Sequence, residues 1–158
     1  MEATLRAVLK IKGAEIISVP PRATVYHAIE TMNAARIGSV LIIDDEALVG
    51  IFSERDVLTR VIPGGHDPHT LRVDAVMTRR LTTAAPEDRV GDTLALMTRR
   101  RIRHLPVIED GRLIGIVSIG DLTKWITESL RKEVSELSAY IASPYALNPK
   151  SVPPDAQS

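Results

Sequence analysis

The chain has 158 residues, enough for one domain with a buried core, and its 44% hydrophobic and 25% charged residues are typical of a soluble globular protein. Twenty basic and twenty acidic side chains cancel, so the basic excess of a nucleic-acid-binding protein is missing, and the lack of cysteine excludes disulfides. No apolar run approaches the roughly 18 residues of a membrane span or forms a signal-peptide core, so we expect a cytoplasmic protein that binds neither nucleic acid nor membranes.

The predicted elements of the first half alternate between helices and strands. Apolar residues at helical spacing predict a short amphipathic helix over 4–12 and a second helix over 24–36 with one buried stripe. The apolar, β-branched run at 39–43 predicts a strand buried on both faces. Three further elements complete this half: strands at 16–19 and 48–52 and a helix over 53–61.

The second half repeats this order after a linker rich in Gly and Pro. A turn at Glu109-Asp110-Gly111 places glycine where a positive φ suits it. The predicted elements are a strand at 81–84, a helix containing Val90, Leu94 and Met97, strands at 105–108 and 113–117, and a helix from Ile119.

The last helix extends beyond its counterpart in the first half. Apolar residues continue at spacings of four or three through Leu130, Val134, Leu137 and Ile141. A lone protruding helix cannot bury such a stripe, so a second copy of the chain is the natural cover. The alternative is that the helix folds back on its own body. The Pro-rich tail that follows is predicted to be disordered.

One motif occurs twice, at an offset of 65 residues and without a gap. Gly50-Ile51-Phe52-Ser53-Glu54-Arg55-Asp56 returns as Gly115-Ile116-Val117-Ser118-Ile119-Gly120-Asp121. A gapless internal repeat indicates one supersecondary unit used twice, each copy covering the apolar face of the other. Two equivalent Ser/Asp sites are therefore expected on one compact body.

The repeated Ser/Asp pairs have two interpretations. A Ser followed three residues later by an acid is a capping box, which only starts a helix. However, each motif follows a glycine within a strand, which often marks close backbone approach or a ligand. A carboxylate accepts two hydrogen bonds well, so Asp56 and Asp121 suit the diol of a ribose better than phosphate. Phosphate needs cations, and the cations near the motifs are Arg55, Arg101, Arg103 and His104.

The whole pattern resembles the CBS domain pair, also called a Bateman module. The two motifs, together with Ser18-Val19-Pro20-Pro21, Thr83-Ala84-Ala85-Pro86 and Arg103-His104-Leu105-Pro106-Val107-Ile108, carry the resemblance. It implies an α/β fold of tandem β-α-β-β-α repeats packed as a pseudo-twofold pair, here with an extended C-terminal helix. It also implies dimers shaped as flat discs, and clefts that bind AMP, ADP, ATP, NAD or S-adenosylmethionine.

The resemblance assigns roles to residues that match the family. Asp56 and Asp121 would hold ribose beside Ser53 and Ser118, and Ser18 and Thr83 would line the two clefts. Arg103 and His104, with Arg55, would bind phosphate; the first copy has Gly38 and Ser39 in place of that pair, so its cleft is expected to lack the two cations. The expected segments are an N-terminal helical segment (1–14), a first repeat (15–62), a linker (63–79), a second repeat (80–130), a helix extension (131–143) and a disordered tail (144–158).

Other functional signals are weak. His66 and His69 lie in the linker with Asp67 as the only nearby acid, which favours a solvated loop over a metal site. No spacing typical of a catalytic triad or a carboxylate pair is visible. We therefore expect a homodimeric regulatory protein, not an enzyme, that binds AMP, ATP or NAD without a catalytic cofactor and acts on an unidentified protein. The alternatives are a purely structural dimerisation module whose Ser/Asp pairs only cap helices, and an unrecognised enzyme.

Overall fold

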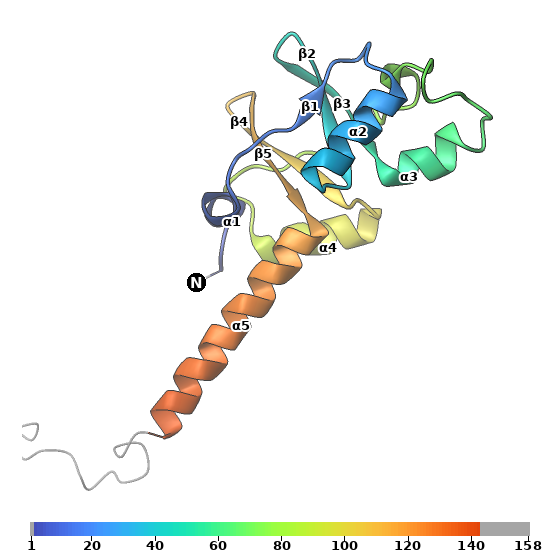
Figure 1. Ribbon diagram of the computed structural model, residues 1–158. Helices are drawn as coiled ribbons and strands as arrows, with labels where there is room; N and C mark the ends of the chain where they lie inside the picture. The colour runs from blue at the N-terminus through green and yellow to red at the C-terminus, as the bar shows by residue number, and fades with distance from the viewer. Residues whose placement is uncertain (1, 143–158) are drawn as a thin grey trace, which may run out of the picture.

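The computed structural model describes residues 2–142. The predicted tail at 144–158 lies outside the described residues. The fold is α/β, with two repeats and a long last helix, as predicted (Figure 1). No helix among residues 2–142 is long and apolar enough to cross a membrane.

Each repeat is built on an antiparallel hairpin flanked by helices. In the first, β2 (Ser39–Asp44) pairs with β3 (Ala47–Ser53); in the second, β4 (His104–Glu109) pairs with β5 (Arg112–Ser118). A bulge lies at the equivalent place in both hairpins, between Ile42 and Ile43 and between Val107 and Ile108. The remaining elements are α1 (Leu5–Lys12), β1 (Ser18–Val19), α2 (Val25–Ala35), α3 (Glu54–Asp56), a π-helical turn (Val57–Val61), a 3-10 turn (Val73–Ala75), α4 (Val90–Arg100) and α5 (Ile119–Ile141).

The predicted strand at 81–84 does not form, and this prediction is wrong. In the first repeat, Leu41 donates its backbone N–H to the carbonyl of Ile17 at 3.2 Å, which ties β1 to β2. The residue at the equivalent place in the second repeat is Pro106, which has no N–H to donate. Only an isolated bridge between Ala84 and Val107 remains.

Each repeat has a core of its own, completed by a segment from outside the predicted repeat. Helix α1 buries Leu5, Val8 and Leu9 among side chains of the second repeat. The first repeat is completed by the segment around the 3-10 turn, where Val73 and Met77 are buried. Val8 and Val73 are also separated by the repeat offset of 65 residues. The segment predicted as a linker therefore contributes to the core as well as connecting the repeats.

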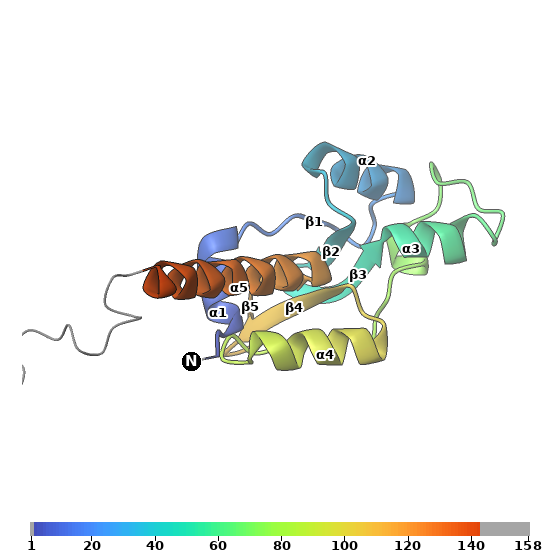
Figure 2. The same cartoon turned by 90° about the horizontal axis from the view of Figure 1, so that it is seen from below.

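Helix α5 leaves the body after its first turns and runs outward as a single helix (Figures 1 and 2). Leu122 is fully buried in the second core, whereas the last apolar residues of the helix are exposed. Leu130, Val134, Leu137 and Ile141 each keep between 55% and 62% of their surface in solvent. The alternative in which the helix folds back on its own body is therefore wrong.

Candidate nucleotide-binding clefts

Both repeated motifs form capping boxes where a strand ends and a helix begins. The backbone N–H of Ser53 donates to Asp56 Oδ2 at 2.9 Å, and that of Ser118 donates to Asp121 Oδ2 at 2.8 Å. These bonds fix each carboxylate in the wall of a cavity. Capping and ligand binding are therefore compatible, because the cap holds the acid in place and leaves its second oxygen to other partners.

The glycines before the motifs are explained by core packing. A Cβ on Gly50 would lie 2.4 Å from Met77 Sδ, and one on Gly115 would lie 2.7 Å from a methyl carbon of Leu9. The close approach predicted for these glycines is real, but its partners are the segments that complete the two cores. These positions are therefore no sign of a ligand.

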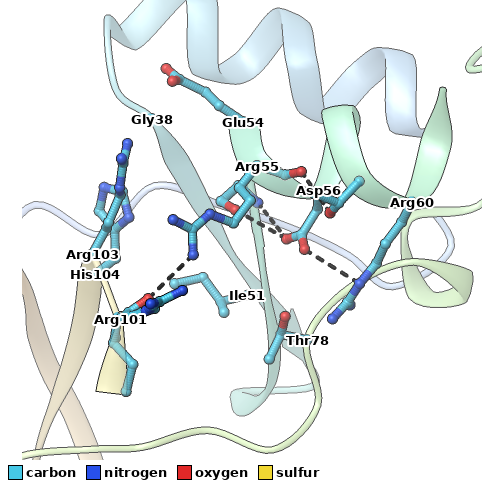
Figure 3. Close-up of a pocket in the computed structure, with 13 residues that line it drawn as sticks. Gly38, Ile51, Glu54, Arg55, Asp56, Arg60, Thr78, Arg101, Arg103 and His104 are labelled. Atoms are coloured by element: carbon cyan, nitrogen blue, oxygen red, sulfur yellow. Dashed lines mark hydrogen bonds and ion pairs between the residues drawn. The ribbon is translucent and has the colours of Figure 1, made fainter. Parts of the chain in front are cut away.

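A cavity of about 320 Å³ contains Asp56 and draws its wall from both repeats (Figure 3). Asp56 is only 6% exposed, and Arg60 Nε lies 3.6 Å from its Oδ1. Ile51 and Ile102 supply apolar surface. Besides Asp56 and Arg60, the charged and polar residues of the wall are Ser53, Glu54, Arg55, Thr59, Thr78, Arg101, Arg103 and His104.

Arg103 lies in the opposite cleft from the one predicted, and His104 lines both clefts. Arg103 and His104 line the cavity of Asp56, which the sequence interpretation had expected to lack them. The physical reason is the packing of the two repeats, which brings the starts of β2 and β4 together. A Cβ on Gly38 would lie only 3.5 Å from His104 Cε1. The residues at the start of each strand therefore line the cavity that contains the aspartate of the other repeat.

A second cavity of about 400 Å³ contains Asp121 and Ser118. Its wall includes Ser39 from the first repeat, and Gly38 and His104 line both cavities. Lys12, at the end of α1, places its Nζ 2.5 Å from Asp121 Oδ2. The two cavities are thus related by the repeat but differ in charge around the acid.

Two predicted cleft residues lie elsewhere. Ser18 and Thr83 are exposed and line neither cavity. Ile17, which precedes Ser18, lines the second cavity, and Thr78 lines the first. The sequence interpretation missed Lys12, Arg36, Arg60 and Thr78; the i, i+4 spacing from Asp56 could have indicated Arg60.

Two titratable groups in the clefts have shifted pKa values. Burial, reinforced by the charge of Lys12, lowers the pKa of His104 from its ordinary value. Burial acts to raise the pKa of Asp121, but the hydrogen bonds from Lys12 and Ser118 outweigh it and hold that pKa below its usual range. His104 is therefore disposed to be neutral and Asp121 to be ionised.

His69, in the linker, makes local contacts. His69 Nδ1 lies 3.2 Å from Asp67 Oδ1, and its ring stacks on Tyr26 with centroids 4.3 Å apart. Within residues 2–142, no group of three or more His, Cys, Asp or Glu side chains is placed to hold a metal ion. Local contacts therefore account for His69 without a bound metal ion.

The sequence matches the family model of the CBS domain twice, over residues 6–62 and 73–128. The chain belongs to the CBS domain family. It is 39% identical over 127 residues to the mitochondrial CBS domain-containing protein CBSX3 of Arabidopsis thaliana, covering 77% of this chain and 62% of that one. It is 31% identical over 108 residues to the CBS domain-containing protein YhcV of Bacillus subtilis, covering 68% and 76%. The chain thus spans less than two thirds of CBSX3, and 22% of the Arabidopsis relative CBSCBSPB3.

Solved structures of CBS pairs have the same fold. The crystal structure of the CBS domain protein NE2398 superposes with a TM-score of 0.78 at 35% identity, covering 80% of this chain and 99% of that one. The CBS domain pair of protein MJ0100, solved with 5′-methylthioadenosine and S-adenosylmethionine, has a TM-score of 0.72 at 21% identity and covers 82% and 99%. The predicted fold and family are therefore confirmed.

Proposed function

We propose that this CBS pair is a regulatory module that binds an adenine nucleotide in the cavity of Asp56. CBS pairs are regulatory modules, and the pair of MJ0100 holds two adenosine compounds. The observation that carries the proposal is the shared wall of this cavity, where a buried carboxylate of one repeat faces cations of the other.

The chemistry of the cavity matches the three parts of such a ligand. The Asp56 carboxylate, with Ser53 beside it, suits the donors of a ribose diol. Arg103 and His104, with Arg55, suit phosphate, because guanidinium groups make charge-assisted and often bidentate bonds to it. Ile51 and Ile102 offer an apolar surface for a base. AMP, ATP and NAD share these parts, and Asp121 with Ser118 would hold the ribose of a second nucleotide.

Titration calorimetry with AMP, ATP and NAD tests this function, together with analysis of adenosine compounds released from the denatured protein. Asp56→Asn should weaken binding about tenfold or more, since hydrogen bonds to a charged acceptor contribute roughly 1.5–3 kcal/mol. Glu30→Gln is the matched control, because Glu30 is exposed on α2 and lines neither cavity. Failure of wild type to bind any of the three below about millimolar would remove the proposal's support.

The regulatory output would be a change of shape or of partner. We expect the target to be a protein that is still unidentified, and the module itself to be non-catalytic. The exposed stripe Leu130, Val134, Leu137 and Ile141 supports a homodimer, since a second copy would cover it. A cytoplasmic location stays a prediction.

A purely structural dimerisation module is the second candidate. The observation that favours it is that both capping boxes are complete without a ligand. This candidate predicts that Asp56→Asn lowers the free energy of unfolding and changes no nucleotide binding. The two candidates are therefore separated by the same titration.

A further inference from the structure

The second cleft contains an ammonium group where a ligand's ribose would bind. Lys12 Nζ donates to Asp121 Oδ2 at 2.5 Å and to the backbone carbonyl of Ile116 at 2.7 Å. Both Asp121 and Ile116 line this cavity. Asp121 Oδ2 already accepts the backbone N–H of Ser118. Lys12 and the cap together thus fill one of the two oxygens that a ribose diol would need.

The first cleft differs at the equivalent positions. The residue 65 positions after Lys12 is Met77, which carries no charge. The carbonyl of Ile51, the counterpart of Ile116, accepts the backbone N–H of Thr78 at 2.8 Å. The ammonium of Lys12 therefore replaces a backbone donor, and in doing so it also reaches the acid.

The cation beside Asp56 is a weaker competitor. Arg60 Nε lies 3.6 Å from Asp56 Oδ1, beyond ordinary hydrogen-bond length, and its Nη1 donates instead to the carbonyl of Val76 at 3.0 Å. Within the part of the chain that the structure describes, Asp56 Oδ1 has no hydrogen bond, and Oδ2 accepts only from Ser53, through its N–H at 2.9 Å and its hydroxyl at 3.2 Å. The difference from Asp121 is therefore that no cation is hydrogen-bonded to the carboxylate. A diol can approach it without displacing a bonded cation.

The position of Lys12 is held by the core. It is the last residue of α1, whose apolar face is buried in the second repeat through Leu5, Val8 and Leu9. Because the helix is already fixed, ordering the side chain against Asp121 costs less than for a lysine on a mobile loop. The contact is about one-third exposed, so it competes with a ligand without closing the cleft permanently.

We infer that Lys12 is a specificity-determining residue that occupies the Asp121 carboxylate as an internal competitor, so that nucleotide binds in the Asp56 cleft first. This inference rests on the proposed function. It makes the pair a one-site binder at low nucleotide concentration, although the sequence contains two matching Ser/Asp motifs. Lys12→Met should open the second cleft, since methionine is the residue at the equivalent position of the other repeat.

The test measures the stoichiometry and affinity for AMP and adenosine by calorimetry, with and without Asp56→Asn. Wild type should bind one equivalent tightly, and Asp56→Asn should bind weakly. Adding Lys12→Met to Asp56→Asn should raise affinity about tenfold for both ligands, the change expected from removing a charge-assisted competitor. Lys10→Met is the matched control, because Lys10 is exposed on the same helix and lines neither cavity.

Several results would overturn the inference. Two equal sites in wild type would do so, as would an unchanged Asp56→Asn affinity after adding Lys12→Met. If adding Lys12→Met lowered the affinity for AMP and left the affinity for adenosine unchanged, Lys12 would be a phosphate contact instead. If Lys12→Met does not fold, Lys12→Gln decides, since it removes the charge of the side chain and keeps most of its length; adding it to Asp56→Asn should raise affinity, and no change would overturn the inference. Absence of binding in every variant would overturn the proposed function as well, which distinguishes the two failures.

Discussion

Arg55 donates a hydrogen bond from Nη1 to the backbone carbonyl of Arg101 at 3.4 Å, across the boundary between the repeats (Figure 3). Arg101 adopts a left-handed conformation with φ of 55° at the end of α4, and Arg103 follows two residues later. The side chain of Arg55, inside the first motif, thus contacts the segment that carries the cations proposed to bind phosphate. This hydrogen bond joins the two walls of the cavity.

Arg103→Ala should weaken AMP binding by about tenfold and leave adenosine binding nearly unchanged. The reason is that a guanidinium contributes a charge-assisted bond to phosphate and none to an uncharged nucleoside. Calorimetry with the two ligands measures the difference. Arg99→Ala is a suitable control, because Arg99 is exposed on α4 and lines neither cavity. Equal losses for AMP and adenosine would show that Arg103 does not face phosphate.

Gly50→Ala should lower the free energy of unfolding by about 1–3 kcal/mol, the usual cost of overpacking a core. The new Cβ would lie 2.4 Å from Met77 Sδ and 3.1 Å from the carbonyl oxygen of Thr78, and the backbone atom cannot swing away. Gly91→Ala is the control, since a Cβ at that place in α4 meets no atom within 4 Å. Urea denaturation should show a loss for the first variant and a small gain for the second. Equal stability of the two variants would contradict this account of Gly50.

The free energy of unfolding at acidic pH should depend on His104. Because burial lowers the pKa of His104 in the folded state, the unfolded chain binds more protons as the pH falls below about 6.5. The neutral imidazole therefore stabilises the fold fully above that pH and progressively less below it. Urea denaturation of wild type and His104→Gln between pH 7.5 and 5.5 measures this. Wild type should lose stability relative to the variant as the pH falls, and parallel curves would refute the assignment.

Truncation after Thr127 should weaken or abolish the dimer and leave the repeat pair folded. Covering the four exposed apolar side chains that follow would contribute about 6–12 kcal/mol before ordering costs. The truncated chain keeps both hairpins and the buried Leu122. Light scattering coupled to size exclusion gives the mass of both proteins, and circular dichroism checks the fold. A wild type that is monomeric at tens of micromolar, or a truncated form with unchanged dimer mass, would rule out this interface.

The sequence predicts features that depend on neighbouring residues, and it fails where distant segments meet. The hairpins, helix starts and capping boxes follow from local patterns around Ser53 and Ser118. The missing strand before α4 also had a sequence signal, since Pro106 stands where a backbone donor is needed. In contrast, the pairing of Arg103 with the cavity of Asp56 depends on how the repeats pack. The contact of Lys12 with Asp121 joins an N-terminal helix to the second motif, and no local rule predicts it.

Each core is completed by a segment from outside its own predicted repeat, and this affects how the chain can fold during synthesis. Helix α1 leaves the ribosome before either hairpin, yet the side chains that bury Leu5, Val8 and Leu9 belong to the second repeat. The first repeat can complete its own core once Val73 and Met77 have emerged. Until most of the second repeat has followed, the side chains that bury this helix in the folded protein have not yet been synthesised. The unit that was duplicated is thus not the unit that folds, and cutting the chain between the repeats would leave the second half without part of its core.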